Sequence, residues 1–219
     1  MSGALPVLSP LEARVLGVLV EKQHTVPDSY PLTLNALVSG CNQKTSRDPV
    51  IEAGDAEVQA ALDRLKSLSL VVESSGGRVM RYAQNAGKAL GLPPQSVALL
   101  AVLFLRGPQT PGELRINSDR LHRFGDLLSV QAFLEELAER PFVRELPKAP
   151  GAREARWVHL LSGEPDAAAM APQAASPAGD ALSMGEISAM RSHVDQLQRE
   201  VAALRETVSR LVAQLGADR

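Results

Sequence analysis

The chain has 219 residues, a formal net charge of −2 and one cysteine. A single cysteine excludes an internal disulfide and any metal centre built from several thiolates, and it fits a reducing cytoplasm. No apolar run reaches the roughly 18 residues that a membrane span needs, and the near-neutral charge argues against non-specific coating of nucleic acid.

Residues 1–90 predict three helices followed by a β-hairpin. The sequence Ser9-Pro10-Leu11-Glu12 is a capping box that opens the first helix. Apolar spacing predicts a second, short helix that ends near Gly40 and a third that starts near Asp55. Two strands are expected next, at 70–72 and 78–83, joined by a Gly-rich turn.

Residues 91–162 repeat this order. A helix is expected after Pro93-Pro94, and a second capping box runs from Thr110 to Glu113. Ser129 is expected to cap a third helix, and strands are predicted at 142–146 and 155–161. The two halves share this organisation without obvious residue identity.

Three helices and a hairpin are typical of the winged helix, a variant of the helix-turn-helix. The predicted class is therefore α+β and mainly helical, with winged-helix domains at 1–90 and 91–162. The alternative is another small α+β fold with the same element order.

The remaining sequence predicts a flexible linker at 163–184 and a coiled-coil helix at 185–216. The linker is dominated by Ala, Pro, Gly, Ser and Asp and has no apolar period. In the helix, apolar residues recur in alternating steps of three and four, which favours a parallel homodimer. An amphipathic helix packed on its own globular domain is the alternative. The expected seam is Ile187, Met190, Val194, Leu197, Val201, Leu204, Val208, Leu211 and Leu215.

No catalytic or metal-binding pattern is present. Cys41 has Lys44 and Arg47 nearby in sequence, but a small residue at a helix end explains it better than a nucleophile. The histidines at 24, 122, 159 and 193 share no ligand spacing. We therefore expect no catalytic residues, no metal and no cofactor.

A polar segment between the second and third helices is the main candidate for DNA contact, because this connection lies beside the DNA backbone in a helix-turn-helix. The alternative is a folded loop in which Arg47 is paired and Asp48 caps a helix. Both third helices carry carboxylates that repel phosphate, so we expect modest affinity. The candidate contacts are Asn42, Gln43, Lys44, Thr45, Ser46, Arg47, Gln59, Arg64, Lys66, Arg78, Arg81, Arg115, Arg120, Arg123 and Arg153.

Two motifs carry a family resemblance. Cys41-Asn42-Gln43-Lys44, then Arg47-Asp48-Pro49 and Glu57-Val58-Gln59-Ala60-Ala61-Leu62, resembles the YceH-like family of uncharacterised bacterial proteins. Leu105-Arg106-Gly107-Pro108-Gln109-Thr110-Pro111-Gly112-Glu113-Leu114-Arg115 resembles its second signature. The resemblance covers about residues 8–162. It implies two winged-helix units in a cytosolic bacterial protein, often with a helical tail, and no catalytic residues.

The first functional hypothesis is a non-enzymatic, homodimeric, regulator-like protein that binds double-stranded DNA. The alternative is a scaffold of the ScpB type that binds a protein partner and no DNA. The acidic third helices favour the scaffold, and no group of residues supports an enzyme.

Overall fold

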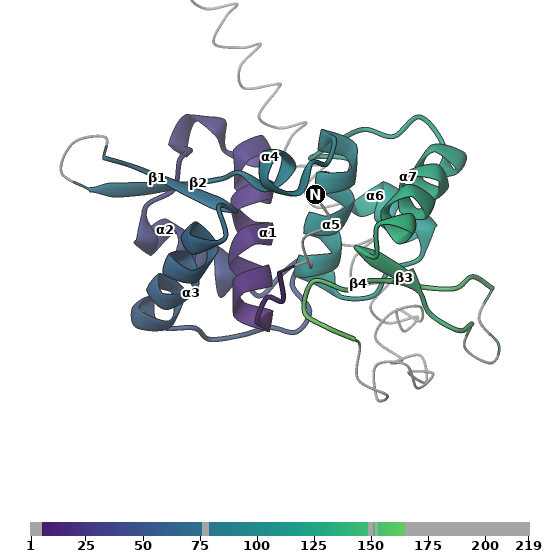
Figure 1. Ribbon diagram of the computed structural model, residues 1–219, viewed down its shortest axis with the longest axis horizontal. Coiled ribbons are helices and arrows are strands. Elements are labelled where there is room, and N and C mark those ends of the chain that lie inside the picture. Colours follow the sequence, from purple (N-terminus) through teal and green to yellow (C-terminus); the bar gives the residue numbers. More distant parts are fainter. Residues whose placement is uncertain (1–5, 76–78, 149–150, 152, 165–219) are drawn as a thin grey trace, which may run out of the picture. The chain divides into compact units, whose positions relative to one another are not determined.

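The structure is a computed structural model that describes residues 6–75, 79–148, 151 and 153–164 (Figure 1). These residues belong to one compact unit, Met1–Pro172, and form a mixed α+β fold. Three predicted features lie outside the described residues: Arg78, the linker beyond Glu164, and the coiled-coil helix with its nine seam residues. The helix and its homodimer stay predictions, as do the domain boundaries.

The first half consists of α1 (Pro10–Thr25), the 3-10 turn η1 (Pro27–Ser29), α2 (Leu34–Cys41), α3 (Asp55–Ser67), β1 (Val71–Ser75), β2 (Met80–Gln84) and α4 (Ala86–Leu90). The second half consists of α5 (Pro94–Arg106), α6 (Pro111–Asn117), α7 (Leu127–Glu139), β3 (Val143–Glu145) and β4 (Trp157–His159). The predicted order of three helices and a hairpin is therefore present twice, with α4 as an addition.

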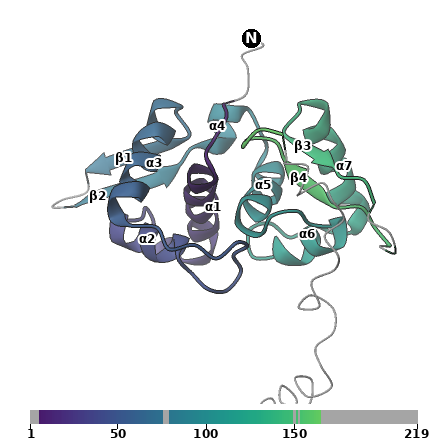
Figure 2. The ribbon, with the colours of Figure 1, turned by 90° about the horizontal axis from the view of Figure 1, so that it is seen from below.

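Helices α1 and α5 lie side by side and form the centre of the described fold (Figure 2). Every residue of α1 from Ala13 to Val20 is buried, and so is every residue of α5 from Ser96 to Leu105. A helix that is buried all round belongs in a core rather than at a surface. Gly17 permits the close approach, since a Cβ there would lie 3.0 Å from Cγ of Leu105. One hydrophobic cluster consequently extends through both halves.

In the first half, α2 and α3 pack on α1, and β1 pairs with β2 as an antiparallel hairpin. The side chain of Thr33 caps α2, and Glu57 accepts from the backbone N–H of Gly54 at the start of α3. Leu32, just before α2, forms a β-bridge with Tyr82 on the hairpin.

The second half repeats this arrangement with shorter strands. Gln109, just before α6, forms a β-bridge with Trp157 on the β3–β4 hairpin. The predicted capping box at Thr110 is present. The predicted cap of the next helix was wrong, because Asp126 and not Ser129 caps α7. The Asp126 carboxylate accepts from both the backbone N–H and the hydroxyl of Ser129. None of the helices in the described ranges combines the length and apolarity that crossing a bilayer requires.

Candidate functional site

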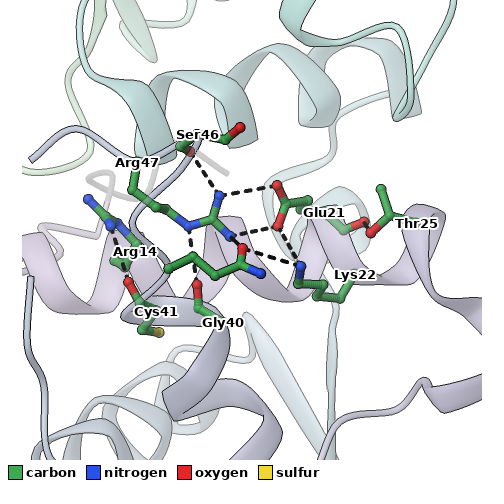
Figure 3. A network of polar contacts seen from close by, with 9 residues as sticks. Arg14, Glu21, Lys22, Thr25, Gly40, Cys41, Ser46 and Arg47 are labelled. Carbon is green, nitrogen blue, oxygen red and sulfur yellow. Dashed lines mark hydrogen bonds and ion pairs between the residues drawn. The ribbon is translucent and has the colours of Figure 1, made fainter. Parts of the chain in front are cut away.

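Arg47 is the centre of a buried polar network between α1, α2 and the loop that follows α2 (Figure 3). Only 6% of the residue is exposed. Its Nη2 donates to Glu21 Oε2 at 2.7 Å and to Gln43 Oε1 at 2.8 Å. Its Nη1 donates to Glu21 Oε1 at 3.2 Å and to the Ser46 carbonyl at 2.9 Å, and its Nε donates to the Gly40 carbonyl at 3.2 Å. All parts of the guanidinium are therefore held inside the protein.

Glu21 supplies the negative charge of this network. Burial raises the pKa of its carboxyl, but the hydrogen bonds and charges of Arg47 and Lys22 together lower it by more, so the net shift is downward. Lys22 adds a contact at 3.3 Å from its Nζ to Glu21 Oε2. The carboxylate consequently stays charged although it is largely buried.

The rest of the loop divides into held and exposed residues. Asn42 donates to the Ala53 carbonyl at 2.9 Å and accepts from the Ala53 N–H at 2.8 Å, which closes the loop before α3. Lys44, Thr45 and Ser46 are exposed. The folded-loop alternative thus describes Asn42, Gln43 and Arg47, whereas the other three remain accessible to a phosphate.

Most other candidate contacts in the first half also have intramolecular partners. Gln59 accepts from the Tyr82 hydroxyl, and Arg81 donates to the Pro31 carbonyl at 2.7 Å. Lys66 pairs with Glu73 and Asp63, and the hydrogen bond to Glu73 raises its pKa. Arg64 is exposed on α3, close in sequence to the exposed carboxylates of that helix.

All the candidates in the second half are accessible. Arg115, Arg120, Arg123 and Arg153 are all exposed. Arg123 makes a 3.4 Å ion pair with Asp119, and that pair is itself solvent-exposed. The loop before β4 carries Arg153, whereas Arg115 lies in α6 and Arg120 and Arg123 follow that helix.

Two of these arginines, Arg115 and Arg123, line a surface groove of about 550 Å³. It is lined by Arg115, Ile116, Asp119, Arg123, Phe124 and Gly125. Ile116 is 75% exposed, and at the start of α7 Leu127 and Leu128 are 42% and 79% exposed. We define the α6–α7 surface as this groove together with Leu127 and Leu128.

Sequence reasoning missed the apolar part of the α6–α7 surface. Leu114 and Ile116 are the apolar residues that follow the capping box at Thr110. The two are only two positions apart, and a short helix cannot point both side chains into one core. Leu114 is fully buried, and Ile116 consequently faces outward.

The remaining titratable groups show no catalytic arrangement within the described ranges. Cys41 is buried, and burial raises the pKa of its thiol to about 11, which disfavours the nucleophilic thiolate. His159 packs edge-on against Phe104 at 4.8 Å, and burial lowers its pKa to about 4. Across the part of the chain that the structure describes, no group of three metal-ligating side chains comes together.

Comparison with known proteins places the chain in a family. The family described as "Protein of unknown function, DUF480" matches residues 8–152. A UPF0502 protein of Leptothrix cholodnii is 58% identical over 214 residues, which cover 96% of this chain and 96% of that protein. A UPF0502 protein of Cupriavidus taiwanensis is 58% identical over 216 residues, or 97% and 89% of the two chains. One of Burkholderia orbicola is 55% identical over 217 residues, or 98% and 92%. The chain therefore belongs to the DUF480 (UPF0502) family of uncharacterised bacterial proteins, and the resemblance to YceH-like proteins is confirmed because that is the same family.

Proposed function

We propose that this protein is a non-enzymatic, cytoplasmic tandem winged-helix protein that binds a partner polypeptide on its α6–α7 surface. Two equivalent β-bridges support the winged-helix assignment. In each half the residue pair joins the segment before the second helix to the hairpin, Leu32 with Tyr82 and Gln109 with Trp157. A short third strand in this place is typical of winged helices.

The observation that carries the proposal is the exposure of Ile116, which lines the groove, and of Leu127 and Leu128, which follow the groove residue Gly125 closely in sequence. Single exposed apolar side chains are common on soluble proteins, but a contiguous apolar patch rimmed by polar groups is typical of a protein-binding site. The patch occupies the second helix and the start of the third helix of its winged helix. In DNA-binding members of this fold class, that position meets the major groove and carries polar side chains.

The charges around the patch define the partner. Arg115 and Arg123 are exposed and line the groove together with Ile116, and Arg120 is exposed in the same segment of the chain. Of the two nearby carboxylates, Asp119 pairs with Arg123 and Asp126 is engaged in capping α7. A partner segment that presents apolar side chains flanked by Asp or Glu would match this surface in both respects.

DNA binding is the competing function, and the contacts in the first half weigh against it. Arg47, Lys66 and Arg81 make intramolecular contacts, and Arg47 has no donor left for a phosphate. The exposed part of α3 begins with Asp55 and Glu57, whose charges repel a phosphate backbone.

Site-specific photocrosslinking tests the proposal in the full-length chain. A benzoylphenylalanine residue replaces Leu128 in one variant and Glu136, an exposed residue further along α7, in the control. We expect crosslinking to one discrete polypeptide from position 128 only, and loss of that product when Ile116→Glu or Arg123→Glu is added. The identified polypeptide should contain an apolar segment flanked by acidic residues, and that segment alone should bind the purified chain.

Three outcomes would overturn the proposal. One is equal crosslinking from positions 128 and 136. Another is crosslinking only to a second copy of this chain, which would make the surface a self-association interface. A third is salt-sensitive binding to duplex DNA that Arg115→Glu and Arg120→Glu abolish, which would restore the DNA-binding hypothesis.

A further inference from the structure

A second pocket, independent of the α6–α7 surface, lies where the start of α1, the 48–53 segment, the end of α5 and the end of β4 meet. Its volume of about 430 Å³ is within the range of small-molecule sites. Leu11, Ile51, Leu103 and Phe104 give it apolar walls.

Unpartnered polar atoms concentrate in this pocket. Among the described residues, five buried side-chain nitrogen or oxygen atoms have no hydrogen-bond partner. Three of them belong to residues that line the pocket: Nε of Arg14, Nδ1 of His159 and Oγ of Ser162. Buried polar atoms normally have partners, so three orphans in the walls of one cavity point to a ligand-binding site. Almost no solvent reaches these three atoms, so a ligand meets them only after a small shift of the neighbouring side chains.

Arg14 is the deepest of these groups, with only 3% of the residue exposed. Its Nη1 and Nη2 donate to the carbonyls of Cys41, at 3.3 Å, and Pro49, at 2.6 Å. The ion pairs among the described residues do not include Arg14. A buried guanidinium without a carboxylate favours an anionic group at its remaining N–H donors.

The outer part of the pocket has the opposite charge. Asp48, Glu52 and Glu57 line it and are exposed. A simple organic anion would gain from Arg14 but would be repelled by these carboxylates. A simple amine would gain from the carboxylates and leave Arg14 unpaired.

We propose that this pocket binds a small zwitterion with an apolar body, of the class of apolar α-amino acids. The carboxylate accepts from Nε of Arg14, and the ammonium group faces the acidic rim. The apolar side chain packs against Leu103 and Phe104, and the His159 ring and the Ser162 hydroxyl supply additional hydrogen bonds.

Calorimetric titration of the full chain with three matched probes tests the inference. L-phenylalanine carries both charges, 3-phenylpropanoate only the carboxylate, and phenethylamine only the ammonium. We expect saturable binding of L-phenylalanine, and binding at least about tenfold weaker for each of the other two, since each lacks one charge-assisted contact.

Two variants locate the ligand. Glu52→Gln, on the exposed rim, should weaken L-phenylalanine several-fold and leave 3-phenylpropanoate unchanged. Arg14→Lys should weaken both probes that carry a carboxylate, with its fold checked by thermal unfolding. Glu136→Gln, an exposed acid on α7, is the control and should change nothing.

The inference is wrong if none of the three probes binds saturably, or if 3-phenylpropanoate binds as tightly as L-phenylalanine. Binding of L-phenylalanine that Glu52→Gln leaves unchanged would also overturn it, because the ammonium would then lie elsewhere. None of these results bears on the α6–α7 surface, so this inference and the proposed function fail independently.

Discussion

Arg47 is a positively charged residue that is almost completely buried, so its effect on stability depends on its hydrogen-bond partners. The guanidinium joins Glu21 on α1 to the carbonyls of Gly40 and Ser46 and to the amide of Gln43. A buried ion pair of this kind contributes little more to stability than an apolar pair of the same volume. Removing one partner, however, leaves the other as an unpaired buried charge, which is strongly destabilising. Arg47 therefore fixes the loop between α2 and α3 through a penalty for breaking the pair.

We expect Arg47→Met to lower the free energy of unfolding by about 3 kcal/mol at neutral pH, because Glu21 would remain charged and largely buried. Urea denaturation measures this change. Lys44→Met, which removes an exposed cation from the same loop, should change stability by less than about 0.5 kcal/mol.

The Arg47→Met prediction carries a pH signature. The folded-state pKa of Glu21 is lowered, so its contribution is present above the ordinary carboxyl pKa and is lost as the pH falls through the folded pKa. The difference between wild type and Arg47→Met should consequently narrow in acid. A difference that is small at neutral pH, or that Glu21→Gln does not partly restore in the double variant, would contradict the role given to Arg47.

The direction of a polar side chain is what the sequence leaves open. The polar segment that starts at Asn42 is recognisable as a special loop, and the family resemblance also depends on it. Whether Arg47 points to solvent or inward depends on Glu21, 26 positions earlier, and no local pattern links the two residues. The same applies to Asn42, whose partner is the backbone of Ala53.

At the scale of elements, sequence patterns predicted helix starts correctly where the capping hydrogen bonds join residues close together in the chain. The capping boxes at Ser9 and Thr110 depend on residues three positions apart, and both are present. Errors arose where two nearby residues compete, as in the choice between Asp126 and Ser129 at the start of α7. The strand predicted at 155–161 is shorter, Trp157–His159, because pairing with β3 extends over only three positions.

Gly40 shows how closely α2 approaches α1. A Cβ at this position would lie 2.6 Å from Cγ1 of Val18, so either the Val18 side chain or one of the two helices would have to shift. We expect Gly40→Ala to destabilise the protein by about 1–3 kcal/mol, an overpacking cost that exceeds the gain in helix propensity. Thermal unfolding measures the change.

Gly112→Ala is the matched control, since Gly112 is also helical and its nearest neighbours would be 3.8 Å from the new Cβ. That variant should be neutral or slightly more stable. If Gly40→Ala behaves in the same way, then α2 does not pack against α1 as tightly as this contact indicates.

At the scale of the whole described unit, the pairing of α1 with α5 is the feature that no single segment predicts. Each helix shows an apolar pattern, but full burial requires that both be covered by elements distant in sequence. The pocket at Arg14 has the same origin, because its lining comes from α1, the 48–53 segment, α5 and the residues around β4. Sequence patterns gave the element order, whereas the sites depend on this long-range packing.

A shared core should make the two halves unfold together, and the single tryptophan provides the reporter. Trp157 lies in the second half and is 3% exposed, whereas Leu62 on α3 lies in the first half and is fully buried. We expect Leu62→Ala to lower the free energy of unfolding by about 2–5 kcal/mol. If the unit unfolds cooperatively, every spectroscopic probe reports this loss, wherever it lies in the unit. The urea midpoint followed by Trp157 fluorescence should therefore fall, as it should for Leu134→Ala on α7 in the tryptophan's own half. A midpoint that Leu134→Ala lowers and Leu62→Ala leaves unchanged would mean that the halves unfold separately and that the contact between α1 and α5 does not couple them.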